Sequence, residues 1–264
     1  MSFVRINVQP DTLDDENRKF VQQALQQPLF LNSVPKSGSH LLRNIVRMFV
    51  PVESQYQAEF IQYHFLQQHL AAFDRTANRL SWGHLFYLDA SRAAVRGVRH
   101  IVLVRDPYDW VLAQARFVAS NEFQVPGLDQ YKRPDVPVEA LLNLVIEGIK
   151  PQLAPLQITY HFNAVAWLDA GVHLVRYEEL VAALRELEQP AAAQYFKRLL
   201  DACGIECPDD WRDRVRIGSD RKQSGTAREN LTGAGGRIPS TLPDFQKQMV
   251  DQAYPGLRAK LGYQ

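Results

Sequence analysis

The sequence lacks the features that would place the protein in a membrane or send it for secretion. No uninterrupted apolar run reaches the ~18–20 residues that cross a bilayer. The first 16 residues contain no basic stretch followed by an apolar stretch, so no secretory signal is recognisable. We therefore expect a cytoplasmic protein without a transmembrane segment.

Cysteine and net charge are also scarce. The two cysteines, Cys203 and Cys207, form a C-x3-C pair without a nearby histidine, which is a poor zinc site, and we expect two reduced structural thiols. The 30 basic and 29 acidic residues give a formal net charge of +1. Nucleic-acid-binding domains are usually more basic, so we expect no nucleic-acid partner. A local basic pocket for a phosphorylated small molecule remains compatible with this balance.

What the chain does contain is typical of one α/β domain spanning residues 1–264. Apolar residues make up 46% of the sequence, enough for a real core. Short apolar segments at 29–34, 100–104 and 172–175 predict strands, and helices are predicted at 11–26, after residue 40, from 106 to about 120, and over most of 138–170. This alternation predicts a mostly parallel central sheet flanked by helices.

Residues 35–40 form a P-loop-like phosphate-binding turn between the first strand and the next helix. They do not match the Walker pattern G-x-x-x-x-G-K-[ST]. Gly38 allows the backbone to approach an anion, Ser37 and Ser39 supply hydroxyl groups, and Lys36 supplies a positive charge. The N-terminus of the following helix adds partial positive charge. The alternative interpretation is an ordinary turn with an exposed lysine.

A second candidate segment, residues 102–107, places Arg105 directly after a strand. An arginine there can hold a phosphate through two parallel hydrogen bonds. The alternative is a surface ion pair with Asp106 or Asp109. Ligands of parallel sheets bind at the carboxyl ends of the strands. The 35–40 turn, Arg105 and Tyr177 all follow predicted strands, which favours one common site.

Together these segments resemble the sulfotransferases that use 3′-phosphoadenosine 5′-phosphosulfate (PAPS). The family's 5′-phosphosulfate loop reads P-K-S-G-T-x-W and its 3′-phosphate segment reads R-[ND]-P-x-D. The corresponding residues here are Pro35-Lys36-Ser37-Gly38-Ser39 and Arg105-Asp106-Pro107-Tyr108-Asp109. Residues 175–180 look like the family's Y-E-D-L segment, and Arg221-Lys222 looks like its R-K-G loop.

The resemblance implies a donor site without a metal, in which PAPS is the donor and 3′-phosphoadenosine 5′-phosphate (PAP) the product. Tyr177 would contact the adenine. The 3′-phosphate would be held by Arg105, Arg221 and Lys222. The 5′-phosphosulfate would be cradled by Lys36, Ser37, Gly38, Ser39 and His40.

Three positions depart from the family pattern. Ala113 stands where the 3′-phosphate segment usually has a serine, Leu41 replaces an adenine-stacking tryptophan, and Gln223 replaces the glycine of R-K-G. None of these changes removes a charge. A lost neutral hydrogen bond is worth only ~0.5–1.5 kcal/mol, so we expect weaker or differently arranged binding of the donor.

The resemblance also indicates a general base. Ser81-Trp82-Gly83-His84-Leu85 matches the family's K-T-H segment, which makes His84 the predicted base and Lys36 the predicted catalytic cation. Trp82 replaces the family's lysine. His84 could instead be a structural histidine at a strand end. The rival bases are His64, His69 and two carboxylates, Glu53 and Glu59.

The sequence thus predicts a sulfotransferase acting on a hydroxyl or amine of a small molecule, glycan or lipid. The alternatives are an inactive PAPS- or PAP-binding protein on the same fold, and an ATP-dependent P-loop kinase, which would need a Walker lysine and a magnesium carboxylate. The segments 51–80 and 119–160, which would shape the acceptor pocket, carry no readable motif. Oligomeric state is not predicted. Arg43 and Arg47, spaced i, i+4 on the helix after the turn, are expected to be solvated rather than ligands. A helical core is expected for four aromatic residues whose alternative role is to line an apolar acceptor pocket: Tyr56, Phe60, Tyr63 and Phe65.

Overall fold

The computed structural model describes residues 11–57, 60–120, 127–224 and 234–264. These residues group into two compact units. The sheet unit contains 11–57, 60–104 and 162–224, and the helical unit contains 105–120, 127–161 and 234–264. The prediction of a single domain over 1–264 stays a prediction.

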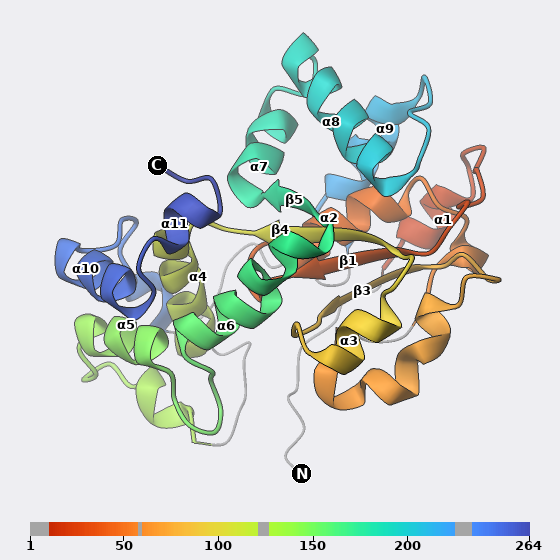
Figure 1. Cartoon of the computed structure of the whole chain (residues 1–264). Coiled ribbons are helices and arrows are strands. Elements are labelled where there is room, and N and C mark those ends of the chain that lie inside the picture. Colours follow the sequence, from red (N-terminus) through yellow and green to blue (C-terminus); the bar gives the residue numbers. More distant parts are fainter. Residues whose placement is uncertain (1–10, 58–59, 121–126, 225–233) are drawn as a thin grey trace. The chain divides into compact units, whose positions relative to one another are not determined.

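A five-stranded sheet forms the centre of the sheet unit (Figure 1). All four strand pairs are parallel, and the order across the sheet is β2-β3-β1-β4-β5. The α/β class with a parallel sheet flanked by helices is therefore confirmed. The strands are β1 (Leu29–Ser33), β2 (Ile61–Gln62), β3 (Leu80–His84), β4 (Arg99–Val104) and β5 (His173–Arg176).

Helices pack on both faces of this sheet because the buried strands are apolar on both sides. On one face, Leu29 and Leu31 of β1 join a core to which α2, α7, α8 and α9 contribute. On the other face, Phe30 packs edge-on against Phe73, with ring centroids 5.2 Å apart. The helices of this unit are α1 (Leu13–Asn17), α2 (Ser39–Arg47), α3 (Asp89–Ala94), α7 (Tyr177–Arg185), α8 (Pro190–Cys203) and α9 (Trp211–Ser219), with 3-10 turns at Val52–Ser54, Tyr63–Phe73 and Val165–Ala170.

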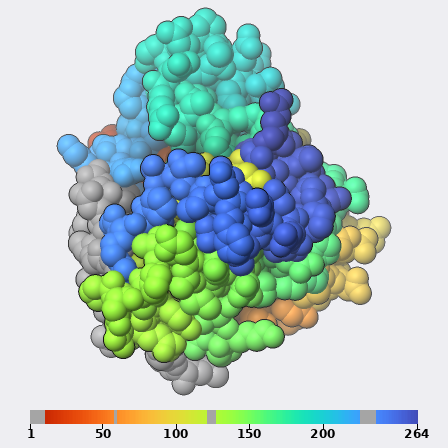
Figure 2. Space-filling view, turned by 90° about the vertical axis from the view of Figure 1, so that its left-hand side faces the viewer, coloured from red at the N-terminus to blue at the C-terminus, as the bar shows by residue number. Residues whose placement is uncertain are grey.

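The helical unit is built around α4, which Asp106 caps by accepting a hydrogen bond from the Tyr108 N–H at 2.9 Å. Figure 2 shows α10 in blue lying against α5 in light green, in agreement with their packing in the structure. Within the described residues the elements are α4 (Pro107–Ala119), α5 (Val138–Glu147), α10 (Asp244–Ala253) and α11 (Leu257–Lys260), with 3-10 turns at Asp129–Lys132 and Ala234–Arg237; α6 (Leu156–Asn163) begins in this unit and ends in the sheet unit.

The predicted helix over 11–26 is wrong in its length. The observed α1 ends at Asn17, whose buried amide donates to the carbonyl oxygens of Arg47 and Val50, the latter at 3.0 Å. The chain then leaves the helical path, and Val21, predicted to lie on an apolar helix face, is 86% exposed. The two cysteines are unbridged, as predicted.

Candidate functional site

The turn after β1 has an unusual backbone. Lys36 has φ +67° and Gly38 has φ +92°, so two residues of the loop adopt left-handed conformations. A non-glycine residue rarely does so, and such strain is concentrated at functional sites. Gly38 then begins α2 as its N-cap without a side-chain cap. The loop therefore turns back on itself at the positive end of a helix, which suits an anion.

The serines of this loop are buried. Ser37 is fully buried, and its hydroxyl has no hydrogen-bond partner in the part of the chain that the structure describes. An unsatisfied buried polar group costs ~1–3 kcal/mol, which a bound oxyanion could recover. The Ser39 Oγ lies 2.7 Å from the Ser33 Oγ at the end of β1. These hydroxyls fit the phosphosulfate group that the sequence predicts there.

Tyr177 lies directly on this loop. It is the first residue of α7, after β5, and its ring packs over Gly38 so closely that a Cβ at Gly38 would sit 2.5 Å from the Tyr177 Cδ2 atom. Gly38 is thus required both by its positive φ and by this contact. The structure brings the predicted adenine contact and the predicted phosphosulfate loop together.

His84 is the last residue of β3, next to β1 in the sheet. Its Nδ1 atom lies 3.0 Å from the carbonyl oxygen of Ser33 and 3.1 Å from the Ser33 Oγ. Through Ser33, the predicted base is connected to Ser39 of the loop. When Nδ1 carries the proton and donates to this carbonyl, Nε2 keeps its lone pair and can accept a proton.

The pKa of His84 is lowered from 6.5 to about 4, mainly by burial; the hydrogen bond to the Ser33 carbonyl opposes this shift, and the nearby charge of Lys36 adds to it. The imidazole is therefore neutral at pH 7. One face of its ring is covered by Phe60, which stacks on it with centroids 4.8 Å apart and planes 12° apart. His40 contacts the same Phe60 ring edge-on at 4.7 Å. Lys36, His40 and His84 consequently share one neighbourhood.

Trp82 stands where the family has a lysine, and the cation of another residue, Arg43, lies against its ring. Its side chain is 2% exposed, and the guanidinium of Arg43 lies 3.9 Å from the ring centroid. Burial, followed by the charge of Arg47, lowers the pKa of Arg43 to about 10, so it stays protonated at pH 7. The prediction that Arg43 and Arg47 are solvated is wrong. Arg47 is 2% exposed and pairs with Asp11 and Asp14.

Arg221 and Lys222 lie in an exposed turn after α9, in the same sheet unit as the loop. The Lys222 N–H donates to the Asp220 carboxylate at 2.9 Å, which holds this turn. Arg105 directly follows β4 and belongs to the helical unit, where its carbonyl accepts a hydrogen bond from the Tyr160 hydroxyl at 2.8 Å. The assignment of Arg105 to the same site stays a prediction.

The rival bases have other surroundings. His69 Nδ1 lies 3.0 Å from the Tyr56 hydroxyl, and His64 lies edge-on to Tyr63 at 5.8 Å. Glu53 lies in the 3-10 turn Val52–Ser54, and Glu59 lies outside the described residues.

Two predicted core side chains of this segment are on the surface. Tyr63 is 37% exposed and Phe65 is 51% exposed, so the prediction of a helical core is wrong for both. Residues 63–73 form successive 3-10 turns rather than an α-helix with one buried face.

Sequence reasoning missed Ser33, and it assigned Phe60 to a helical core and Arg43 to the solvent. Ser33 is separated from His84 by 51 residues, and their contact arises from the pairing of β1 with β3. Nothing local in the sequence marks it. Arg43 is expected from the sequence to point into solvent, but its guanidinium lies on the ring of Trp82. Trp82 is far from Arg43 in the sequence, so only the fold reveals this contact.

No protein-family model and no curated protein matches the chain. Solved structures do match. Mouse sulfotransferase SULT7A1 complexed with PAP has a TM-score of 0.57 and 17% identity, covering 94% of this chain and 87% of that chain. Retinol dehydratase in complex with androsterone and the inactive cofactor PAP has a TM-score of 0.50 and 12% identity, covering 89% and 80%. The chain therefore has the sulfotransferase fold.

Two further findings concern membranes and metals. Of the helices that the structure describes, none combines the length and apolarity needed to cross a membrane. Within the same residues, no three His, Cys, Asp or Glu side chains gather as candidate metal ligands.

Proposed function

We propose that this chain is a sulfotransferase that takes a sulfuryl group from PAPS and transfers it to a hydroxyl or amine. The observation that carries the proposal is the link from His84 through Ser33 to Ser39, which joins a neutral imidazole to an oxyanion-binding loop. The buried hydroxyl of Ser37 and the left-handed turn at Lys36 support donor binding. The two solved structures compared above are both complexes with PAP.

In the proposed reaction, Nε2 of His84 accepts the proton of the acceptor hydroxyl while its oxygen attacks sulfur. The new oxygen–sulfur bond forms as the bond from sulfur to the bridging oxygen of PAPS breaks, and PAP leaves with that oxygen's electron pair. Negative charge develops on the leaving oxygen, and a cation beside that oxygen stabilises this transition state. Lys36 supplies this cation, and its charge also helps to lower the pKa of His84, which favours the neutral imidazole.

The donor is held by residues of the sheet unit and, as proposed from the sequence, by Arg105. Lys36, Ser37, Gly38, Ser39 and His40 bind the 5′-phosphosulfate, and Tyr177 lies beside the adenine. Arg105, Arg221 and Lys222 bind the 3′-phosphate. Arg43 on Trp82 places a second cation on the α2 face of the sheet, which replaces part of the positive charge lost with the family's lysine.

The acceptor is a small molecule, glycan or lipid, and the protein is proposed to act in the cytoplasm. Retinol dehydratase binds androsterone on a similar fold. A screen with labelled PAPS and a panel of alcohols, phenols, sugars and amines tests the proposal. Transfer of label to one acceptor class, with release of PAP and without added magnesium, supports it.

A PAP-binding protein without activity is the second candidate, favoured by the apolar Trp82 at the family's lysine position. Such a protein binds PAP but transfers label to no acceptor. An ATP-dependent kinase would instead require magnesium and ATP, and would bind PAP no better than ATP.

A further inference from the structure

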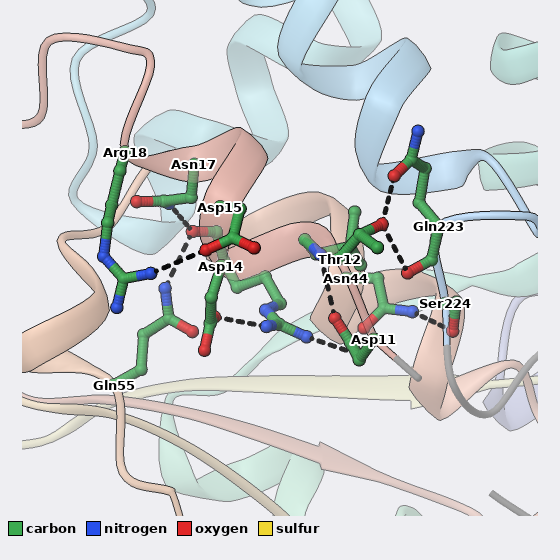
Figure 3. Close-up of polar contacts among 12 residues, drawn as sticks. Asp11, Thr12, Asp14, Asp15, Asn17, Arg18, Asn44, Gln55, Gln223 and Ser224 are labelled. Carbon is green, nitrogen blue, oxygen red and sulfur yellow. Dashed lines mark hydrogen bonds and ion pairs between the residues drawn. The ribbon is translucent and has the colours of Figure 1, made fainter. Parts of the chain in front are cut away.

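The turn that carries Arg221 and Lys222 is held by contacts from two directions. Within the turn, the Gln223 N–H donates to the Asp220 carbonyl at 3.1 Å. Outside it, partners come from α2 and from the segment before α1, as Figure 3 shows for Asn44 with Ser224 and Thr12 with Gln223. Thr12, Asn44 and Ser224 lie outside the family motifs, whereas Gln223 stands at the glycine position of R-K-G.

The contact from α2 is buried. The Asn44 Nδ2 donates to the Ser224 Oγ at 2.8 Å, and the two residues are 3% and 5% exposed. Because water cannot replace either partner there, this hydrogen bond constrains the end of the turn more than an exposed one would.

The backbones of α2 and α9 also touch just before the turn. A Cβ at Gly218 would lie 2.6 Å from the Asn44 carbonyl oxygen and 2.8 Å from the Ile45 Cα. Gly218 is therefore what allows α9 to end against the middle of α2. The two helices form one packed pair, with the start of the turn fixed to α2.

The segment before α1 holds the turn from the other direction. The Thr12 N–H donates to the Gln223 carbonyl at 3.0 Å. The same segment is tied to the far end of α2, because Asp11 pairs with Arg47 at 3.0 Å and Asp14 pairs with Arg47 as well. The turn is thus attached to α2 both directly and through this segment.

α2 begins at Ser39, in the loop proposed to bind the 5′-phosphosulfate. Asn44 follows five residues later, about 7.5 Å along the helix axis. We propose that Asn44 and Ser224 are positioning residues that fix the Arg221–Lys222 turn relative to the Lys36–Ser39 loop, so that one nucleotide can place its two phosphate groups on both. This inference rests on the proposed function, because it assigns the two segments to the 5′- and 3′-phosphates.

Affinity for PAP compared with 5′-AMP, which lacks the 3′-phosphate, tests the inference by isothermal titration calorimetry on the full chain. We expect Asn44→Ala to lower the ratio of PAP to AMP affinity about tenfold, equal to ~1.4 kcal/mol, with AMP affinity nearly unchanged. Ser224→Ala removes only a hydroxyl group and should also lower the ratio of PAP to AMP affinity. In the double variant the PAP-to-AMP ratio should fall little further than in either single variant, because each single substitution already removes the same hydrogen bond.

Gln55→Ala is the matched control. The Gln55 amide is also buried and donates to the carbonyl oxygens of Arg47, the last residue of α2, and of Val50 just after it, at the opposite end of the helix from the loop. It should leave the PAP-to-AMP ratio unchanged while lowering stability. Equal losses of the ratio in Gln55→Ala and Asn44→Ala would overturn the inference, as would an unchanged ratio in Asn44→Ala and Ser224→Ala. A wild-type chain that binds PAP no better than AMP would overturn the proposed function as well.

Discussion

The Nδ1 atom of His84 lies 3.0 Å from the backbone carbonyl oxygen of Ser33. This contact crosses from β3 to the end of β1, just before the phosphate-binding turn. A backbone carbonyl can only accept, so the hydrogen bond selects the His84 tautomer with the proton on Nδ1. It leaves Nε2 as the atom that can take a proton from an acceptor.

The pH dependence of sulfuryl transfer should reflect the lowered pKa of His84. Only the neutral imidazole accepts a proton, and burial keeps it neutral until the pH approaches about 4. As the pH falls from 8, the rate should stay level past pH 6.5 and reach half its maximum near pH 4. A midpoint near 6.5, the ordinary histidine value, would contradict this assignment.

Replacement of His84 by alanine should abolish transfer while PAP still binds. General-base catalysis contributes ~10²–10⁴-fold, so the turnover number should fall by at least about a hundredfold. His69→Ala is the matched control, because His69 is a rival histidine paired with Tyr56 rather than with the loop. Full activity in His84→Ala together with a large loss in His69→Ala would reverse the roles.

Replacement of Gly38 by alanine should prevent donor binding. The added Cβ would meet the ring of Tyr177 at 2.5 Å, and the φ of +92° is itself unfavourable for alanine by ~1–2 kcal/mol. Gly171→Ala separates these effects, since Gly171 also has a positive φ, +74°, but an added Cβ there meets nothing within 4 Å. Titration calorimetry should find PAP binding lost only in Gly38→Ala. The free energy of unfolding should fall by a comparable amount in both variants from the unfavourable φ alone.

The ion pairs of Arg47 should matter for stability. Its side chain is 3% exposed and pairs with Asp11 and Asp14, so Arg47→Ala would leave two carboxylates without their cation. Loss of one partner of a fully buried pair costs ~3–5 kcal/mol. Because the Asp11 and Asp14 side chains are 30% and 33% exposed, water screens the charges left behind, and we expect a smaller loss of about 2 kcal/mol by urea unfolding. Arg18→Ala removes the exposed pair with Asp15 and should cost less than about 1 kcal/mol. Similar losses of unfolding free energy in the two variants would contradict the prediction that the buried ion pairs of Arg47 stabilise the fold more than an exposed pair does.

Strands with continuous apolar runs could be predicted from the sequence. β1, β4 and β5 lie within a residue or two of the predicted segments. The side chains of β1, and those of β4 after Arg99, are buried on both faces, whereas in the edge strand β5 only Val175 is buried. β2 has only two residues, and β3 contains Ser81 and Gly83, so neither has a clear apolar run. The helix over 11–26 was overestimated because the amide of Asn17 bonds to carbonyl oxygens 30 and 33 residues away.

The candidate site was predictable where it depends on local sequence. The turn at 35–40 contains its glycine, lysine and serines in one short segment, and the structure places a left-handed loop there. The roles of Ser33 and Asn44 depend on partners far along the chain, His84 and Ser224, and no periodicity marks them. The burial of Arg43 likewise depends on Trp82 of β3.

Binding of PAP is the most direct measure of the central claim. At ~100 times its dissociation constant, a ligand that binds only the folded state adds about 2.7 kcal/mol to the free energy of unfolding. For a chain of this size that raises the melting temperature by about 5 °C or more. Our account predicts such a shift with millimolar PAP, without magnesium, and a smaller one with AMP or with ATP and magnesium. No shift with PAP, or a larger shift with ATP and magnesium, would contradict it.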